Sequence, residues 1–394
     1  MKRPDLIKKG ANIAITAPSF GCTTEPYKTC LKSAVSKFKS MGFNVTVGKN
    51  VDMDCGVGIS NTPEACAREL MDFYMDDSID MVISAGGGEL MCKILDFMDF
   101  EKLKNVKPKW FAGYSDNTNF IYPLTTLTDH MAIYGPCAPS FGTEWHKSHK
   151  DLFDLAEGMI DRVENYDSWE IESKKDADHP LEPYNLTEKS CLSAYDFRDI
   201  SNGCQSFSRR CQSSGRESSS YASDDTDNSN ISAALNELNT TGILNKQKYQ
   251  PFNTSDISFT GRLAGGCLDC LELLSGTRFD GIKSFNEKYG NDGIIFFIES
   301  CDLNMMSIKR ALWKLKVTGA FDKVSGFLIG RPLHFSDEDF GMDRFGAYLS
   351  ELSELHVPVI MDADIGHLPP SMPIISGARA EVSYTDGSLT INYI

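Results

Sequence analysis

WFAGYSDNT, residues 110–118, is the stretch that decides the fold. An apolar run ends at Gly113, and Ser115 follows it, just ahead of polar and then helix-forming residues. This order predicts a buried strand, a sharp turn and a helix, the unit from which parallel α/β sheets are built. Ser115 has two interpretations. Either Ser115 or Asp116 caps the helix, which the local pattern favours, or Ser115 is a nucleophile on a tight strand-to-helix turn.

The same alternation of strands and helices extends through the first 140 residues, with glycines at another strand end. Parallel sheets place their active sites at the carboxyl ends of their strands, where both Ser115 and the Gly86–Gly88 turn fall. We therefore expect a mostly parallel sheet with helices on both faces. The expected strands are 11–19, 42–49, 79–88 and 109–115, and the expected helices are 27–41, 62–77 (capped by Thr62), 88–99 and 117–127.

A second α+β domain is predicted from about residue 251 onward. It begins with a strand, a Gly265–Gly266 turn and a helix within 256–277, and it ends with a hairpin turning at Asp386–Gly387. Between these lie expected strands at 292–300, 325–332 and 357–367, and expected helices at 306–324 and 345–355.

The segment between the two domains has a different composition. Eleven of the 32 residues from Ser201 to Ser232 are serine. Such a segment has too few apolar side chains to offset the entropy lost when the chain is ordered. We therefore expect 190–248 to be a disordered insertion or a long flexible loop, with a phosphorylated or partner-binding tail as the alternative. The expected division is an N-terminal domain at 1–165, an interdomain segment at 166–250 and a C-terminal domain at 251–394.

Charge and composition exclude several classes of partner. The net charge of −16 would repel nucleic acid and anionic membranes. No apolar run approaches the roughly 20 residues that span a bilayer, and the N-terminus lacks the apolar core of a signal peptide. A cytoplasmic protein is expected. Of the twelve cysteines, only Cys267 and Cys270 form a close pair. Without a second pair a zinc site is not expected, and core positions are favoured over a redox role.

Three further candidates for a catalytic role lie at predicted strand ends. Glu299 ends an apolar strand and needs a buried partner, either an imidazole or an arginine such as Arg310 or Arg331. His367 follows another strand beside a glycine, and it is either a structural histidine or one that faces a cleft. The Gly86–Gly88 turn matches no nucleotide fingerprint, but it can bring backbone N–H groups close to an oxyanion or a phosphate. A serine, a histidine, an acid and such a turn together meet the requirements of acyl transfer.

These blocks together resemble the LD-carboxypeptidase family (serine peptidase family S66), which includes the microcin C immunity proteins. The resemblance covers nearly the whole chain except about 185–250. Its motifs, in chain order, are ITAPS, SAGGG, GYSDNT, YGP, GRLAGGCLDCLELLSGT, IIFFIES, GFLIGRP and ADIGHLPPSMPIISGARAEV.

The resemblance implies a Ser-Glu-His triad made of Ser115, Glu299 and His367, with oxyanion donors at the N–H groups of Asp116 and of Gly87 or Gly88. It also implies an N-terminal flavodoxin-like (class I amidotransferase-like) parallel-sheet domain, a C-terminal α+β domain of the swivelling type, and a site in the cleft between them. The resemblance implies no cofactor and no metal, and it implies a homodimer.

Two substrate classes follow from the resemblance. The expected function is that of a serine carboxypeptidase of the LD-carboxypeptidase type, which hydrolyses the L,D-peptide bond before the terminal D-alanine of a murein tetrapeptide. The alternative is the reaction of the immunity branch, whose motifs are closer and which cleaves an amide in a peptidyl- or aminoacyl-nucleotide. Arg331 is a candidate partner for a substrate carboxylate, or else a structural ion pair. Trp169 is a candidate for stacking on a base. An inactive binding homologue is the non-catalytic alternative.

Overall fold

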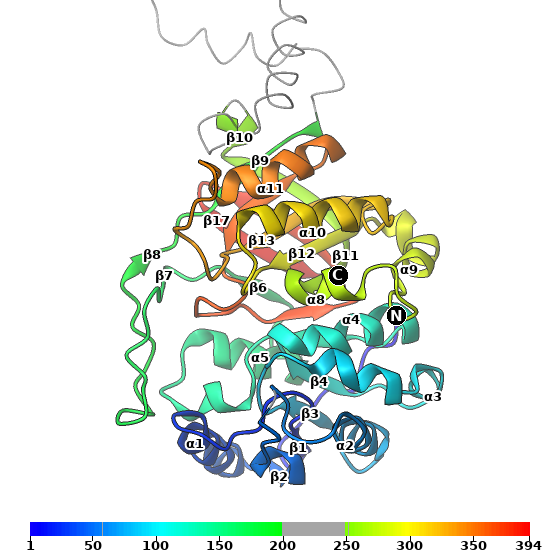
Figure 1. Cartoon of the computed structure of the whole chain (residues 1–394), viewed down its shortest axis with the longest axis vertical. Helices are drawn as coiled ribbons and strands as arrows, with labels where there is room; N and C mark the ends of the chain where they lie inside the picture. Colours follow the sequence, from blue (N-terminus) through cyan, green and yellow to red (C-terminus); the bar gives the residue numbers. More distant parts are fainter. Residues whose placement is uncertain (57, 199–248, 251) are drawn as a thin grey trace, which may run out of the picture.

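Two β-sheets, each with its own helices, form the two halves of the molecule. The computed structural model describes residues 1–56, 58–198, 249–250 and 252–394. The N-terminal sheet and its helices lie at one end of the long axis, and the C-terminal sheet lies above them (Figure 1). The predicted architecture, a parallel-rich N-terminal α/β domain followed by a separate C-terminal domain, is confirmed.

The N-terminal sheet has six strands in the order β15-β5-β4-β3-β1-β2, and its first five strands along the chain run parallel. Strands β3 and β4 are buried along their whole length, as expected where helices cover both faces of a sheet. The elements of this half are β1 (Asn12–Thr16), α1 (Tyr27–Ser40), β2 (Asn44–Val47), η1 (Lys49–Asp52), α2 (Pro63–Met75), β3 (Met81–Ser84), η2 (Met91–Phe97), α3 (Phe100–Lys104), β4 (Trp110–Gly113), η3 (Ser115–Asn117), α4 (Thr118–Thr128), β5 (Ala132–Tyr134), η4 (Ala138–Gly142) and α5 (Lys147–Glu157).

The C-terminal sheet has nine strands in the order β10-β9-β14-β13-β12-β11-β16-β17-β6. Its centre, β11 to β14, is parallel, and antiparallel strands extend it on both sides. Its elements, with the short β7–β8 ribbon, are β6 (Arg162–Glu164), β7 (Ser168–Trp169), β8 (Glu188–Lys189), β9 (Ser193–Tyr195), β10 (Asn253–Thr254), β11 (Asp256–Cys267), α8 (Leu268–Leu274), α9 (Ile282–Tyr289), η7 (Gly290–Asp292), β12 (Ile294–Glu299), α10 (Met305–Val317), β13 (Val324–Gly330), α11 (Arg344–Leu352), η8 (Ser353–Leu355), β14 (Val359–Ala363), β15 (Ile374–Ser376), β16 (Arg379–Thr385) and β17 (Ser388–Tyr393).

Two strands cross the domain boundaries that the sequence suggests. Strand β15, from the C-terminal part of the chain, pairs antiparallel with β5 at the edge of the N-terminal sheet. Strand β6, from the N-terminal part, pairs with β17 at the edge of the C-terminal sheet. Each sheet is thus completed by a strand from the other half of the chain.

The predicted turn at Gly265–Gly266 is wrong, because both glycines continue β11. Their φ angles are +146° and +147°, values that side chains rarely adopt. A Cβ at Gly265 would lie 1.8 Å from the carbonyl oxygen of Phe297, and one at Gly266 would lie 2.6 Å from Cγ2 of Thr118. The glycines therefore allow β11 to approach β12 and α4 closely.

Two further predictions need correction. The helix expected at 88–99 is a 3₁₀ helix, η2, because Met98 is extended and Asp99 caps a new helix, its side chain accepting from the Lys102 N–H. The insertion expected to be disordered from residue 190 includes β9, whose residues are buried and paired with β14. The remainder of that prediction, 199–248, lies outside the described residues.

Two other local predictions are confirmed. Thr62 caps α2 by accepting from the Ala65 N–H, with Pro63 as the first helical residue. The closing hairpin is β16–β17, turning at Asp386–Gly387. None of the helices in the described part of the chain combines the length and apolar character needed to cross a membrane.

Candidate active site

Ser115 lies on a tight turn between β4 and α4. Its φ is +62°, which is unusual for a residue with a side chain and strained in the way that nucleophile turns are. Gly113 allows the Asn117 side chain to pack against the turn, since a Cβ at position 113 would lie only 2.8 Å from Cγ of Asn117. The N-cap of α4 is Asn117, so the capping interpretation of Ser115 and Asp116 does not hold.

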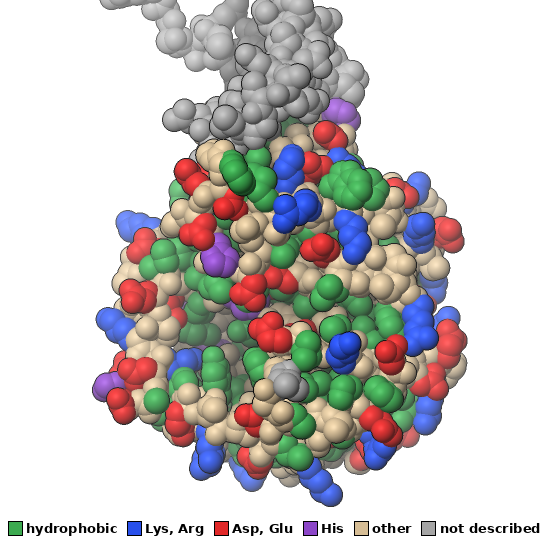
Figure 2. All heavy atoms as spheres, viewed as in Figure 1, with side chains coloured by type: hydrophobic (Ala, Val, Ile, Leu, Met, Phe, Trp, Pro, Cys, Tyr) green, Lys and Arg blue, Asp and Glu red, His purple; other side chains and the backbone are tan. Residues whose placement is uncertain are grey.

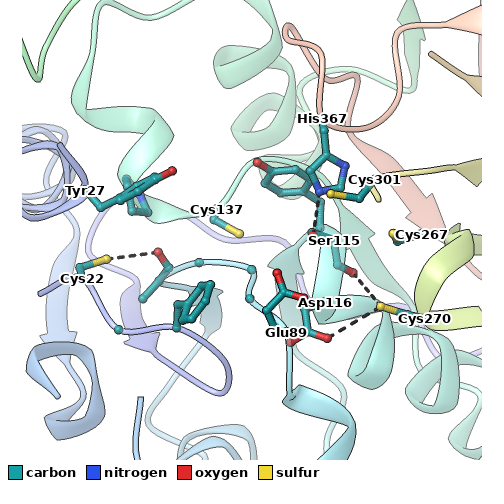
Figure 3. Close-up of a pocket in the computed structure, with 18 of the residues that line it drawn as sticks. Cys22, Tyr27, Glu89, Ser115, Asp116, Cys137, Cys267, Cys270, Cys301 and His367 are labelled. Carbon is teal, nitrogen blue, oxygen red and sulfur yellow. Dashed lines mark hydrogen bonds between the residues drawn. The ribbon is translucent and has the colours of Figure 1, made fainter. Parts of the chain in front are cut away.

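The side chains of Ser115, His367 and Glu299 form a continuous hydrogen-bonded chain across the two sheets. Figure 3 shows its first link, between Ser115 and His367. Ser115 Oγ is 2.8 Å from Nε2 of His367, and Nδ1 of His367 is 2.8 Å from Oε2 of Glu299. A carboxylate only accepts, so Nδ1 carries the proton that faces Glu299. In the neutral ring Nε2 is then free to accept from the serine hydroxyl. The structure therefore brings together the three residues that the sequence selected.

Charge coupling within the pair sets the two pKa values in opposite directions. Burial opposes ionisation of Glu299, but the charge of His367 and hydrogen bonds from His367 and Tyr134 outweigh it, so the Glu299 pKa lies below its ordinary value. Burial also disfavours the charged form of His367, but the Glu299 carboxylate and Cys301 outweigh it, and the His367 pKa lies well above 6.5. The two arginines that were the alternative partners for Glu299 are engaged elsewhere, Arg310 with Ser307 and Arg331 with Asp364.

The glycine turn that follows β3 lies directly beside Ser115. A Cβ built on Gly87 would be 3.1 Å from Ser115 Oγ and 3.8 Å from the backbone nitrogen of Asp116. The turn is held from behind, because the Gly87 carbonyl accepts from Phe20 N–H at 2.9 Å and the Gly86 carbonyl accepts from Asn117 Nδ2 at 2.9 Å. Gly87 thus lines the cavity, is fixed by these hydrogen bonds and lies next to the amide of Asp116, an arrangement that suits an oxyanion site.

The carboxylate of Asp116 is buried and has a structural role. It accepts from Ser19 Oγ at 2.5 Å, from Met91 N–H at 2.8 Å and from Asn119 Nδ2 at 2.7 Å. These bonds fix the residue after Ser115, and with it the direction of its backbone N–H.

A cavity of about 680 Å³ opens in front of these groups, lined by Ser115, His367 and all three glycines of the turn. Its other polar lining consists of carboxylates, thiols and the hydroxyl groups of threonine, tyrosine and serine, and none of the described residues that line it is a lysine or an arginine. Figure 2, which shows the molecule from the same side as Figure 1, has acidic side chains beside the hollow near its middle. The carboxylates that line the cavity are Asp54, Glu89, Asp116, Asp269 and Asp302, and the thiols are Cys22, Cys137, Cys267, Cys270 and Cys301.

Arg331 and Trp169 do not line this cavity. Arg331 is 1% exposed and its guanidinium pairs with Oδ1 of Asp364 at 2.5 Å, while the Trp169 ring packs against it at 4.8 Å. The structural ion pair that the sequence left open is therefore the arrangement observed. Arg331 points away from the cavity because its guanidinium pairs with Asp364, which lies three residues before His367.

Cys267 and Cys270 are buried free thiols beside the site rather than an exposed redox pair. A hydrogen bond to Cys270 and burial raise the pKa of Cys267 well above its ordinary value, which disfavours the reactive thiolate. Only Cys270 belongs to the helix α8, because Cys267 ends β11.

Tyr134 is the site residue that the sequence did not single out by role. It belongs to the YGP motif, but nothing local indicates where its hydroxyl points. In the structure this hydroxyl donates to Oε1 of Glu299 at 2.5 Å and accepts from the Ser115 N–H at 3.1 Å. In the described part of the chain, no group of three or more His, Cys, Asp or Glu side chains is arranged to hold a metal ion.

The fold and the site define a two-domain α/β protein whose polar groups meet where the two sheets face each other. Comparison with known proteins places it in a family of hydrolases. The chain matches the LD-carboxypeptidase N-terminal domain over residues 13–135 and the LD-carboxypeptidase C-terminal domain over residues 260–382. The chain therefore belongs to the LD-carboxypeptidase family.

Individual relatives lie near the immunity branch. The Microcin C7 self-immunity protein MccF of Escherichia coli is 23% identical over 334 residues, covering 84% of this chain and 79% of its own length. The MccF-like protein of Bacillus anthracis has a similar structure, with a TM-score of 0.72, 19% identity and full coverage of both chains. The muramoyltetrapeptide carboxypeptidase of Oxalobacter formigenes gives a TM-score of 0.63 at 18% identity, covering 97% and 98% of the two chains.

Proposed function

We propose that this protein is a serine hydrolase that cleaves an amide or peptide bond in a small peptide-like substrate through an acyl-enzyme. The observation that carries the proposal is the Ser115–His367–Glu299 chain, with both of its links at 2.8 Å. The position of Gly87 in the cavity wall beside Ser115 supports it, because a developing oxyanion could bind there.

The mechanism assigns one task to each residue. His367 Nε2 takes the hydroxyl proton as Ser115 Oγ attacks the scissile carbonyl, and Glu299 stabilises the resulting imidazolium. The N–H groups of Asp116 and of Gly87 or Gly88 bind the oxyanion. The same proton passes from His367 to the leaving amine, the C–N bond breaks, and water activated by His367 hydrolyses the ester.

Two substrate classes remain in competition, and the charge of the cavity favours one of them. An LD-carboxypeptidase substrate brings a free terminal carboxylate next to the scissile bond, and such a group needs a cation. The predicted cation, Arg331, is already paired with Asp364, and the described lining of the cavity offers five carboxylates and no lysine or arginine. This counts against a substrate that ends in a C-terminal D-alanine.

The ligands bound to the relatives support the immunity-type substrate class. MccF has been solved in complex with aspartyl sulfamoyl adenosine and with glutamyl sulfamoyl guanosine. We therefore propose an aminoacyl- or peptidyl-nucleotide amide as the first substrate class to test, with the murein tetrapeptide as the second. Trp169, buried against Arg331, is not proposed to stack on a base. A homodimer stays a prediction, to be checked by analytical ultracentrifugation.

The test is mass spectrometry of purified protein incubated with each substrate. A peptidyl-sulfamoyl-adenosine and a murein tetrapeptide are compared in parallel, with Ser115→Ala as the control. Cleavage of the first by the wild type only would support the proposal, and loss of D-alanine alone would reverse the order of the two classes. Activity retained by Ser115→Ala would refute the assignment of the nucleophile.

The non-catalytic alternative has its own test. A fluorophosphonate probe reacts with an activated serine and not with an unactivated one, so labelling of Ser115 distinguishes a hydrolase from an inactive binding homologue. A folded wild type that is not labelled would favour the binding homologue.

A further inference from the structure

Tyr134 connects the two halves of the site through one oxygen atom. It ends β5 in the N-terminal sheet, is fully buried, and packs its ring 5.4 Å from that of Phe297 on β12. Its hydroxyl contacts the backbone of Ser115, from its own sheet, and the carboxylate of Glu299, from the other sheet.

The direction of each hydrogen bond follows from counting protons. The N–H of Ser115 can only donate, so the Tyr134 oxygen accepts at 3.1 Å. The single hydroxyl proton is then directed to Oε1 of Glu299 at 2.5 Å. Burial and the Glu299 charge raise the pKa of Tyr134 well above 10, which keeps that proton on the phenol.

Glu299 thus has His367 donating to Oε2 and Tyr134 donating to Oε1. The phenol proton draws carboxylate charge away from the side that faces the imidazole. Without it, more of the charge of the buried Glu299 would act on His367 and favour the imidazolium, which cannot take a proton from Ser115.

We propose that Tyr134 is a positioning residue that moderates the hold of Glu299 on His367, so that the base is available near neutral pH, while it anchors the strained Ser115 turn. This inference rests on the proposed function. It assigns to Tyr134 a role in the proton equilibrium of the site, beyond filling the core.

Other titratable groups also face the pair, and they are unchanged in the variants below. They are Cys301, Tyr114 and Glu89 around His367, and Cys267 and Tyr348 around Glu299. A shift seen on changing Tyr134 alone is therefore assigned to its hydroxyl.

The experiment measures the rate of fluorophosphonate labelling of Ser115 as a function of pH in wild type and Tyr134→Phe. The matched control is Tyr122→Phe, because Tyr122 is also buried and donates to a carboxylate, that of Asp280 at 3.3 Å, away from the site. We expect the kinetic pKa of Tyr134→Phe to rise by about half a unit to one unit. Labelling at neutral pH would then be about three- to tenfold slower and would recover at higher pH. Tyr122→Phe should behave as the wild type.

A uniform loss of rate without a shift in the kinetic pKa would mean that Tyr134 only supports the fold, and it would overturn the inference. A downward shift would overturn it as well. If the wild type itself is not labelled, the proposed function fails first, and an NMR titration of the His367 imidazole then decides the pKa effect directly.

A second substitution covers the case in which Tyr134→Phe does not fold. 3-Fluorotyrosine at position 134 keeps the shape of the ring and makes the phenol a stronger donor. It should move the pKa of His367 downward, opposite to the effect of removing the hydroxyl, and an unchanged pKa would count against the role proposed for Tyr134.

Discussion

Gly87→Ala tests the oxyanion site with the addition of a single methyl group. The new Cβ would lie 3.0 Å from Cβ and 3.1 Å from Oγ of Ser115, and 3.8 Å from the amide nitrogen of Asp116. It would therefore occupy the space in which the substrate oxygen must bind. The φ of Gly87 is not in the left-handed region, so the backbone can accept alanine without strain.

The magnitude follows from what the methyl group blocks. Loss of one oxyanion donor costs about 100- to 1000-fold in kcat, roughly 2.7–4 kcal/mol of transition-state stabilisation. The contacts at 3.0–3.1 Å require shifts of only a few tenths of an ångström. We therefore expect the melting temperature of Gly87→Ala to stay within a few degrees of the wild type.

Gly86→Ala is the matched control, one residue earlier in the same turn. A Cβ there would meet only the carbonyl oxygen of Phe20, at 3.8 Å, an ordinary contact. The assay is the rate of fluorophosphonate labelling, since the phosphonyl oxygen takes the place of the oxyanion, followed by kcat on the cleaved substrate. Equal rates in the two variants, with both folded, would refute the placement of the oxyanion site beside Gly87.

Three other predictions concern the charged groups. Glu299→Gln should lower kcat by about 10³- to 10⁴-fold, because an amide favours the wrong tautomer of His367; rates within tenfold of the wild type would contradict this. Because the His367 pKa is raised above 6.5 and the base must be neutral, kcat/KM should rise with pH to a plateau above that value, and a plateau already reached at pH 6 would contradict the coupling to Glu299. Arg331→Met leaves the buried Asp364 carboxylate unpaired and should lower the free energy of unfolding by about 3–5 kcal/mol in chemical denaturation. A raised KM with unchanged stability would instead restore the substrate-binding role.

The sequence predicted the parts of the site that depend on strand ends. Glu299 ends a buried strand and Ser115 and His367 follow buried strands, and the carboxyl ends of parallel strands converge in a predictable way. Arg331 also follows such a strand, but its partner Asp364 lies on a neighbouring loop, and pairing between elements leaves no local pattern. For the same reason the hydroxyl of Tyr134 could not be assigned a role.

Glycine was the other source of error. The pair Gly265–Gly266 has the local composition of a turn, whereas the structure uses it to bring a strand close to its neighbours. The two uses of glycine, free rotation and small size, give the same sequence signal. Only the neighbours Phe297 and Thr118, which come from distant positions in the chain, decide between them.

The exchange of β6 and β15 between the two sheets has a consequence for the order in which the protein matures on the ribosome. The N-terminal sheet lacks its β15 edge until residues 374–376 have been synthesised, although its other five strands are complete by residue 134. Strand β15 begins seven residues after His367 and pairs with β5, the strand that carries Tyr134. Closing this edge therefore draws the segment that contains His367 toward Ser115. Nascent chains that end before residue 367 would carry the serine without its base, and those that end before β15 would lack the strand that fixes the base beside it, so hydrolytic activity would require synthesis to continue through β15.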